Sequence, residues 1–340
     1  MERVRFGRTE LEVSRIALGG IPIMRVPLDD AVDIVKEALK LDINFIDTAN
    51  GYADSEIKIG IGIKGVPRDD IVIATKSGAK DKQTFKVHLD LSLKQLGVDY
   101  IDIYQLHNIT EKTREAVFGP SGAYEGLVEA VQAGKVRFPA FSSHSIPLAV
   151  ELMKKDVFDV VQLPFNYIDD MAAKEAIPLA EKLDMGFIAM KPMGGGLLDD
   201  AGLSFRYLMQ FDTIIPDPGI EKIEEIREIA AIVKGGQLLT EKDRIAIEEQ
   251  RKEAGDSWCH RCDYCQPCPQ GIFIANALNS KSFLKRFPLE RAKMMAGEAM
   301  EKARDCLECR ECVARCPYDL DIPTLLKESI AYWDEYCAAV

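Results

Sequence analysis

Regularly spaced cysteines are the most specific chemical feature of this 340-residue sequence, which has nine of them. Eight lie in two runs, C-x2-C-x2-C-x2-C-P over 259–269 and C-x2-C-x2-C-x3-C-P over 306–317. The second spacing is that of bacterial [4Fe–4S] ligands, in which three thiolates bind one cluster and the fourth binds the other. If each run gives three cysteines to one cluster and its fourth cysteine to the other, the sequence predicts two clusters. Their expected ligands are Cys259, Cys262, Cys265 and Cys316 for the first, and Cys268, Cys306, Cys309 and Cys312 for the second.

Structural zinc is the alternative occupant, because it is bound by pairs of C-x2-C in tetrahedral sites. The triple runs followed by proline favour iron–sulfur clusters over zinc. Cys268 departs most from the pattern, since its run is one residue short before its last cysteine. Cys337 lies outside both runs and is expected to be a free thiol.

Four polar residues in the first third of the chain could form one proton-transfer unit. Asp47, Lys76 and His107 each follow an apolar stretch, and Tyr52 comes shortly after Asp47. A nearby ammonium lowers the pKa of a tyrosine hydroxyl from its usual value of about 10, so that the hydroxyl becomes an acid near neutral pH. Asp47 would keep Lys76 charged, and His107 would orient a carbonyl group by hydrogen bonding. Such an acid beside a hydride donor reduces a carbonyl to an alcohol.

The elements that must position these residues are short apolar stretches rich in β-branched residues, which alternate with amphipathic helical stretches. Eight such stretches are predicted to be strands: 16–18, 44–47, 71–75, 100–106, 136–141, 160–163, 186–190 and 213–215. Their number and alternation predict an α/β fold, a closed (β/α)8 TIM barrel, whose active site lies at the carboxyl ends of the strands. A hairpin at 3–13 is expected to close the opposite end.

An open doubly wound sheet is the competing fold. It would usually carry a G-x-G-x-x-G fingerprint after its first strand. Here that strand is followed by Gly-Gly-Ile-Pro at 19–22, without the third glycine, so we favour the barrel. The pattern changes after 236. We expect the barrel over 1–236, a linker helix over 237–255, and a second, mainly α-helical iron–sulfur domain over 256–340.

The segment D-T-A-N-G-Y-A-D-S-E at 47–56 resembles the D-T-A-x-x-Y-x-x-S-E signature of aldo-keto reductases. The segments 73–76, 102–107, 160–166 and 188–192 are also similar to motifs of that family, in the same order. The resemblance spans roughly 1–233 and implies a barrel that binds an extended nicotinamide cofactor. It also implies a catalytic tetrad with Tyr52 as the general acid, completed by Lys76, Asp47 and His107.

The resemblance further implies that Ser142 and Gln162 bind the nicotinamide carboxamide. Ser143 stands where the family usually has Asn, and Met190 where it has an aromatic that stacks on the nicotinamide. Asp217 stands where the family often has basic residues that bind the 2′-phosphate of NADP. Its carboxylate could instead accept a hydrogen bond from a ribose hydroxyl, so the expected cofactor is either NAD or NADP. Because the aromatic residue that stacks on the nicotinamide is absent, a flavin is an alternative redox cofactor. The expected cofactor-binding residues are Ser142, Ser143, Gln162, Met190, Lys191, Pro216, Asp217 and Gly219.

The second cysteine run and the helical stretch between the runs resemble the α-helical ferredoxin domain of the succinate dehydrogenase iron–sulfur subunit. Hydride transfer needs no one-electron carrier, so the clusters need their own explanation. They could pass electrons between the barrel and an external carrier, or they could only hold the second domain folded. A third interpretation is an iron–sulfur electron-transfer or sensor protein whose barrel is degenerate.

Composition excludes several other classes. The net charge of −12 argues against a nucleic-acid partner, which usually selects a basic surface. No run of 18 uncharged apolar residues predicts a membrane span, and the first residues lack the apolar core of a signal peptide. We therefore expect a cytoplasmic oxidoreductase that acts on a small-molecule carbonyl or alcohol.

Overall fold

The computed structural model of the chain describes residues 1–255, 257–261, 265–316 and 318–339. The chain forms two compact units. The first comprises Met1–Met193 and Asp200–Leu239, and the second comprises Gly194–Asp199 and Thr240–Val340. A six-residue loop from the barrel half of the sequence thus belongs to the second unit, which the sequence did not predict.

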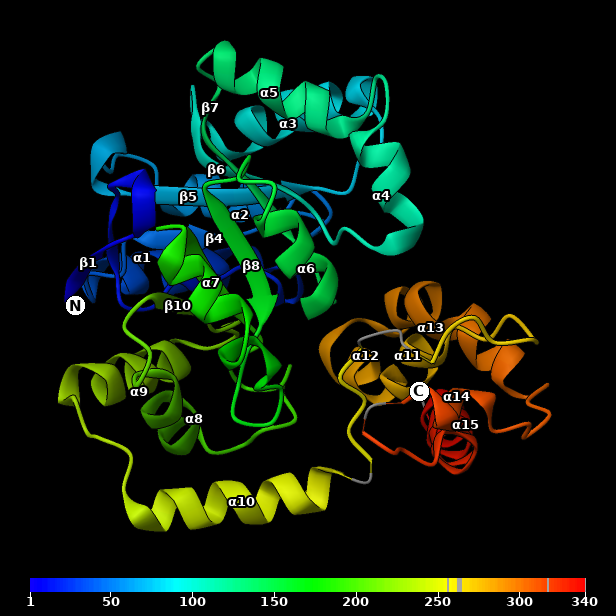
Figure 1. The fold of residues 1–340 in the computed structure, drawn as a ribbon. Helices are drawn as coiled ribbons and strands as arrows, with labels where there is room; N and C mark the ends of the chain where they lie inside the picture. Colours follow the sequence, from blue (N-terminus) through cyan, green and yellow to red (C-terminus); the bar gives the residue numbers. More distant parts are fainter. Residues whose placement is uncertain (256, 262–264, 317, 340) are drawn as a thin grey trace. The chain divides into compact units, whose positions relative to one another are not determined.

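The first unit is the expected (β/α)8 barrel (Figure 1). Its eight strands pair in parallel in sequence order. They are β3 (Leu18–Gly19), β4 (Phe45–Asp47), β5 (Val72–Ser77), β6 (Ile101–Leu106), β7 (Val136–Ser142), β8 (Val160–Pro164), β9 (Gly186–Met190) and β10 (Ile214–Asp217). Two hydrogen bonds join the last strand to the first, from Ala17 N to Pro216 O at 2.8 Å and from Gly19 N to Pro218 O at 2.9 Å. The barrel is therefore nearly closed, as the fold predicted from the sequence requires.

Helices of the first unit connect the strands and cover their outer face (Figure 1). They are α1 (Leu28–Lys40), α2 (Ser55–Gly62), α3 (Lys82–Leu96), α4 (Glu111–Phe118), α5 (Ala123–Gln132), α6 (Ile146–Met153), α7 (Ala176–Lys182), α8 (Ala201–Leu208) and α9 (Ile223–Gly235). Short 3-10 turns lie at η1 (Gly7–Thr9), η2 (Pro22–Arg25), η3 (Arg68–Asp70) and η4 (Met171–Ala173). In α3, Asp81 caps the first turn by accepting from Thr84 N at 2.9 Å, and Gly97 ends the helix at a φ of 69°.

The expected hairpin is formed by β1 (Arg3–Arg5) and β2 (Glu12–Ser14), which pair antiparallel. Between them, Phe6 and Leu11 join a buried cluster with Phe45 and Val72, the first residues of β4 and β5. Gly7 lies so close to Gly186 that a Cβ on it would come 2.5 Å from the Gly186 nitrogen. The hairpin therefore closes the amino-terminal end of the barrel and leaves the carboxyl end for the site.

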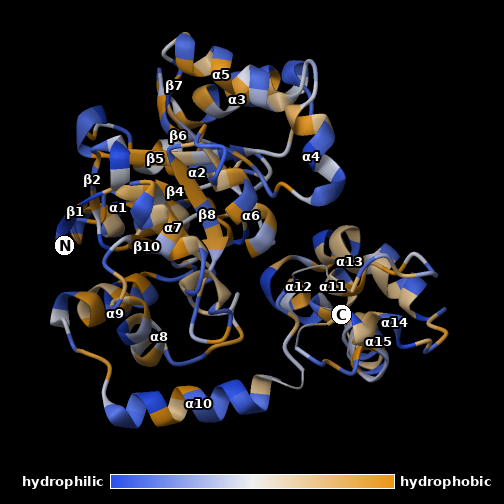
Figure 2. Cartoon of the chain, in the orientation of Figure 1, coloured by the Kyte–Doolittle hydropathy of each residue, from blue (hydrophilic) through white to orange (hydrophobic). Residues whose placement is uncertain are grey.

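The second unit is mainly helical (Figure 1). Its helices are α10 (Glu241–Gly255), α11 (Ile274–Leu278), α12 (Ser280–Arg286), α13 (Leu289–Ala303), α14 (Glu311–Ala314) and α15 (Ile322–Ala339). The predicted linker is thus largely α10, whose residues are mostly hydrophilic (Figure 2) and whose one buried residue is Ile247. Buried Ala292, Met300, Leu326 and Trp333 lie on α13 and α15, which pack together.

The loop Gly194–Asp199 begins with three glycines of positive φ. A Cβ on Gly194 would come 2.8 Å from the Trp258 ring, and one on Gly195 would come 3.1 Å from the Arg286 guanidinium. The loop therefore packs against the second unit at Gly194, where a side chain would not fit. Over the described part of the chain, none of the helices combines the length and the apolar character that crossing a membrane requires.

Candidate active site and cluster sites

Three neighbouring strands and one loop carry the four residues of the predicted tetrad. Asp47 ends β4, Lys76 is the penultimate residue of β5, and His107 directly follows β6. Tyr52 lies in the loop between β4 and α2. Because β4, β5 and β6 are parallel neighbours, all four residues lie at the carboxyl end of the barrel, where barrel enzymes have their active sites.

The loop that carries Tyr52 is held by its own hydrogen bonds. Tyr52 N donates to Ala49 O at 2.9 Å, and Ser55 N donates to Tyr52 O at 2.9 Å. Ser55 Oγ also donates to Gly20 O at 2.9 Å, which ties the start of α2 to the residue after β3. The serine of the sequence signature therefore has a structural role, since it fixes the loop in which Tyr52 lies.

Lys76 and Asp47 form a buried ion pair. Lys76 Nζ donates to Asp47 Oδ2 at 2.5 Å and to Thr48 O at 2.7 Å, and both charged side chains are 3% exposed. Burial opposes the charge of Lys76, but the negative charge of Asp47, the largest of the opposing effects, holds the pKa of Lys76 above its usual value. The ammonium lies 5.2 Å from the centre of the Tyr52 ring, where it favours the phenolate form of Tyr52.

His107 packs edge-on against Tyr52, with ring centres 5.8 Å apart and an interplanar angle of 81°. Burial, helped by the positive charges of Lys76 and Lys80, lowers the pKa of His107 to about 3. The imidazole is therefore neutral near pH 7, and a neutral ring has one N–H to donate. It can orient a carbonyl oxygen beside the Tyr52 hydroxyl without competing as an acid.

Gln162 of β8 links two carboxylates inside the barrel. Its Nε2 donates to Asp217 Oδ2 at 2.7 Å and to Asp47 Oδ2 at 3.2 Å. Its Oε1 is buried and has no hydrogen-bond partner. An orphaned amide oxygen of this kind fits the amide N–H of a nicotinamide, which is the contact that the family resemblance implied for Gln162.

Ser142 is the last residue of β7, and Ser143 is the first residue of the loop before α6. Ser142 Oγ accepts from Asn108 N at 2.9 Å. Ser143 Oγ donates to Ile109 O at 2.8 Å and accepts from Ser145 N at 3.1 Å. Both hydroxyls thus hold the loops after β6 and β7 together, and Ser142 keeps its own proton for a further acceptor.

The remaining predicted cofactor residues lie at the ends of β9 and β10. Met190 ends β9, and Lys191 follows it at a φ of 61° with its carbonyl accepting from Asn166 Nδ2 at 3.1 Å. Pro216 and Gly219 contribute backbone to the closure of the barrel, since Gly219 bridges Gly19. Binding of a cofactor by these four residues stays a prediction.

The position of Asp217 in the structure differs from the position that the sequence predicted. That prediction ended the last strand at 215 and put Asp217 in the loop, facing a ribose. In the structure Asp217 is the last residue of β10 and is 9% exposed, and its Oδ2 accepts from Gln162. The carboxyl group therefore faces the polar centre of the barrel beside the tetrad.

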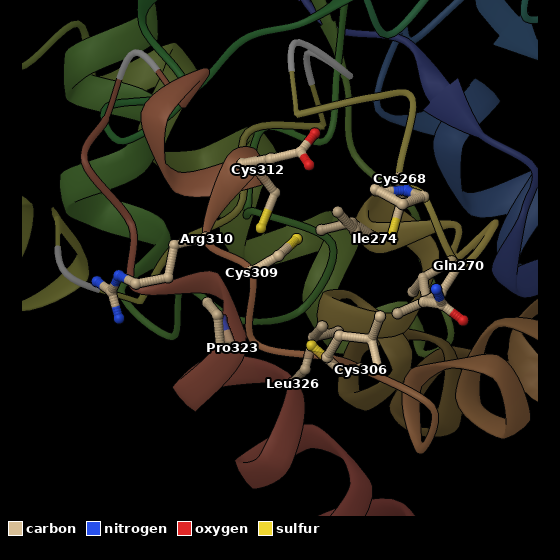
Figure 3. Close-up of a pocket in the computed structure, with 13 residues that line it drawn as sticks. Cys268, Gln270, Ile274, Cys306, Cys309, Arg310, Cys312, Pro323 and Leu326 are labelled. Carbon is tan, nitrogen blue, oxygen red and sulfur yellow. The ribbon is translucent and has the colours of Figure 1, made fainter.

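Four cysteines from the two runs line one cavity of about 150 Å3 in the second unit (Figure 3). They are the four expected to share a cluster: Cys268, Cys306, Cys309 and Cys312. Apolar side chains, among them Ile274 and Leu326, form most of the remaining wall. Burial raises the pKa of the Cys312 thiol, and a bound cation would have to overcome that shift to hold a thiolate there.

The other expected set is described in part. Cys262 lies outside the described residues, whereas Cys265 is buried and Cys259 and Cys316 are half-buried. In the described ranges, the free thiols include Cys268, Cys306, Cys309, Cys312, Cys316 and Cys337. Within those ranges, no group of three or more His, Cys, Asp or Glu side chains is placed as a single metal ion would need.

Two family models match the chain. The aldo/keto reductase family model matches residues 15–238, and the 4Fe-4S dicluster domain model matches residues 258–321. The first match covers more than half of the chain and contains the whole tetrad. This chain belongs to the aldo/keto reductase family. Its barrel therefore comes from a family of oxidoreductases, joined to a dicluster domain.

Curated relatives of this aldo/keto reductase match its barrel. L-galactose dehydrogenase of Arabidopsis thaliana is 31% identical over 215 residues, 58% of this chain and 66% of that protein. NADH-specific methylglyoxal reductase of Escherichia coli is 27% identical over 228 residues, 58% and 69% of the two chains. The chain spans about two thirds of the length of the curated relatives that it matches.

Solved structures support the fold. The holo form of an aldo-keto reductase from Bacillus halodurans superposes with a TM-score of 0.63 at 23% identity, over 73% of this chain and 96% of that one. A thermostable aldo-keto reductase in complex with the inhibitor epalrestat superposes with a TM-score of 0.62 at 22% identity, over 73% and 99%. Both comparisons confirm the predicted barrel.

One residue at the centre of this aldo/keto reductase barrel was missed from the sequence. Gln105 Nε2 donates to Asp47 Oδ1 at 3.1 Å, so Gln105 completes the set of donors around that carboxylate. Its signal is a single amide within the otherwise apolar end of β6, two residues before His107 and paired in register with Lys76. A buried amide at such a position needs a partner, which here is the tetrad carboxylate.

Proposed function

We propose that this aldo/keto reductase reduces small-molecule carbonyl groups with a hydride from a nicotinamide cofactor, and that Tyr52 supplies the proton. The observation that carries the proposal is the buried Lys76–Asp47 pair beside the Tyr52 ring. A bound nicotinamide supplies the hydride in one direction and accepts it in the other. All other steps belong to residues of the chain.

The proton path begins at the Tyr52 hydroxyl. Tyr52 Oη gives its proton to the carbonyl oxygen as negative charge develops on that oxygen, and Lys76 stabilises the phenolate that remains. Asp47 keeps the Lys76 ammonium charged and in place through their hydrogen bond of 2.5 Å. Neutral His107 donates a hydrogen bond to the same carbonyl oxygen. In the oxidising direction Tyr52 acts as the general base for an alcohol.

NAD is the cofactor that we propose in preference to NADP. The stretch from β10 to α9 reads Ile-Pro-Asp-Pro-Gly-Ile-Glu-Lys over 215–222, in which Lys222 is the only cation to meet a 2′-phosphate. The matching relative from Escherichia coli is named as NADH-specific. Anaerobic binding and turnover with NADH, NADPH and reduced flavin, against a panel of aldehydes and ketones that includes methylglyoxal, tests this choice. Faster turnover with NADPH, or turnover only with flavin, would reject it.

We also propose that the second unit binds two [4Fe–4S] clusters, one of them on the four cysteines that line the cavity of Figure 3. Cys309 and Leu307 are exposed at this cavity, with Leu307 68% exposed, so a redox partner could approach the cluster there. In this role the two clusters would each take one of the two electrons that oxidation of the nicotinamide releases together with a proton, and would pass them singly to an external carrier. Bleaching of the cluster absorbance by NADH under anaerobic conditions supports this role.

The competing roles give different results in the same experiment. If the clusters only stabilise the fold, NADH leaves their absorbance unchanged while carbonyl reduction proceeds. If the protein is an iron–sulfur sensor or electron-transfer subunit with a degenerate barrel, no carbonyl is reduced with any cofactor. The loop and helix α4 over 108–124 are expected to select the substrate, because loops at the strand ends define specificity in barrels.

A further inference from the structure

Among the residues that the structure describes, two carboxylates and one cation form a buried group at the centre of the barrel, namely Asp47, Asp217 and Lys76. Asp47 ends β4 and Asp217 ends β10, and the Gln162 amide donates one hydrogen bond to each. Asp217 is 9% exposed and Lys76 is 2% exposed, so water weakens the electrostatic interactions among these charged side chains only a little. Both carboxylates ionised would leave a net negative charge in the barrel interior.

The hydrogen bonds of the two carboxylates are unequal. Asp47 accepts from Lys76, from Gln105 and from Gln162, so both of its oxygens are occupied by donors. Asp217 Oδ2 accepts from Gln162, whereas Asp217 Oδ1 is buried without a partner. Hydrogen bonds to the charged form stabilise an ionised carboxylate, so the better-supplied Asp47 is favoured as the ionised member of the pair. The unequal donors thus favour a proton on Asp217 rather than on Asp47.

The surroundings agree with this assignment. Asp47 from β4 and Lys76 from β5 are the titratable groups that act on Asp217, and the Gln162 amide from β8 donates to it. Burial, followed by the negative charge of Asp47, raises the pKa of Asp217 well above its usual value. Two carboxylates close together in a site of low polarity commonly share one proton in this way.

We propose that Asp217 is a positioning residue that holds a proton at neutral pH, and that this neutral carboxyl keeps Gln162 directed at Asp47 while Lys76 pairs with Asp47 alone. The proposal rests on the proposed reductase function, since its effect on turnover passes through Lys76 and Tyr52. If Asp217 were ionised, it would compete for Lys76 and make proton release by Tyr52 harder. Asp217 is thus a second acid beside the tetrad, which the family resemblance did not imply.

Infrared spectroscopy of the whole protein tests the proton directly and needs no turnover. A protonated carboxyl group absorbs at its own C=O stretching frequency, apart from ionised carboxylates. Glu56 is the matched control, because it is 1% exposed and burial raises its pKa as well. At neutral pH we expect Asp217→Asn to remove a carboxyl band that Glu56→Gln leaves in place. A band absent from the wild type, or removed only by Glu56→Gln, overturns the proposal.

Kinetics separate positioning from mere support of the fold. Asp217→Asn keeps an acceptor for Gln162 and cannot ionise, so the alkaline limb of kcat/KM should move to higher pH. Asp217→Ala leaves the buried Gln162 amide without that acceptor, and its kcat/KM should be about tenfold below that of Asp217→Asn. Equal losses in both variants would show that the charge of Asp217 is needed, which contradicts the proposal. If neither the wild type nor any variant reduces carbonyls, the proposed function is wrong. The infrared result still shows whether Asp217 is protonated.

Discussion

Lys76 Nζ lies 2.5 Å from Asp47 Oδ2 and 5.2 Å from the centre of the Tyr52 ring, so one ammonium joins a buried carboxylate to the proposed acid. The pair is buried, and removal of one partner from a buried pair is costly. The same geometry also defines the chemistry, because the charge of Lys76 depends on Asp47.

Asp47→Asn should lower kcat for carbonyl reduction by about 100-fold, because Lys76 then lacks the charge that keeps it protonated and directed at Tyr52. The substitution is isosteric, so the barrel should keep its fold, which circular dichroism can check. Asp90→Asn is the control, since Asp90 forms an exposed ion pair with Lys135. Wild-type kcat in Asp47→Asn would remove the role given to this carboxylate.

Acidification should destabilise the native protein partly through His107. The pKa of His107 is lowered from 6.5 to about 3 on folding. Between these two pH values His107 is protonated in the unfolded chain and neutral in the native chain. The stabilising contribution is complete above pH 6.5 and is lost as the pH falls from there toward 3. His107→Gln should therefore lose less stability than the wild type on acidification, as measured by urea unfolding at successive pH values. An identical pH dependence of the two proteins would show that His107 is not the group responsible.

Cys309→Ser should remove about half of the iron and acid-labile sulfide, because Cys309 belongs to one of two expected clusters that share no ligand. Cys337→Ser is the matched control, since Cys337 lies outside both runs and should leave the metal content intact. Iron and zinc analysis with electron paramagnetic resonance of the reduced protein gives the measurement. Two zinc ions per chain, or loss of metal in Cys337→Ser, would reject the assignment.

Gly7→Ala should destabilise the barrel by at least about 3 kcal/mol, because strain at a positive φ adds to a backbone clash. The φ of Gly7 is 53°, and a Cβ there would come 2.5 Å from Gly186 N. Gly97→Ala is the control, since Gly97 also has a positive φ of 69° but open space around it. That variant should lose only about 1 kcal/mol in urea unfolding. Equal losses would show that the hairpin does not press on the barrel end.

The alternation of apolar stretches was enough to predict the barrel, because parallel strands buried on both faces need continuous apolar runs. The end of the last strand was wrong for a physical reason. The predicted strand ended at 215, before Pro216, yet β10 continues to Asp217, and the Pro216 carbonyl accepts one of the hydrogen bonds that close the barrel. Proline lacks only the donor, so it fits where its carbonyl alone is needed.

The candidate site was predictable where spacing along the chain encodes geometry. Tyr52 follows Asp47 in the loop after β4, and Cys306, Cys309 and Cys312 of one short motif line one cavity, so spacing along the chain was informative for both. Gln105 and the inward side chain of Asp217 depend on which residues of distant strands meet inside the barrel, and no local pattern records that. The inclusion of Gly194–Asp199 in the second unit has the same tertiary origin.

The measurement that tests the central claim most directly is single-turnover reduction of a carbonyl by Tyr52→Phe with deuterated NADH, followed by mass spectrometry of the alcohol. Tyr100→Phe is the control, because that hydroxyl donates to exposed Asp69 away from the tetrad. We predict deuterium transfer by the wild type and by Tyr100→Phe, with a rate at least about 100-fold lower for Tyr52→Phe. An undiminished rate in Tyr52→Phe would contradict the account, since the proton would then come from another group.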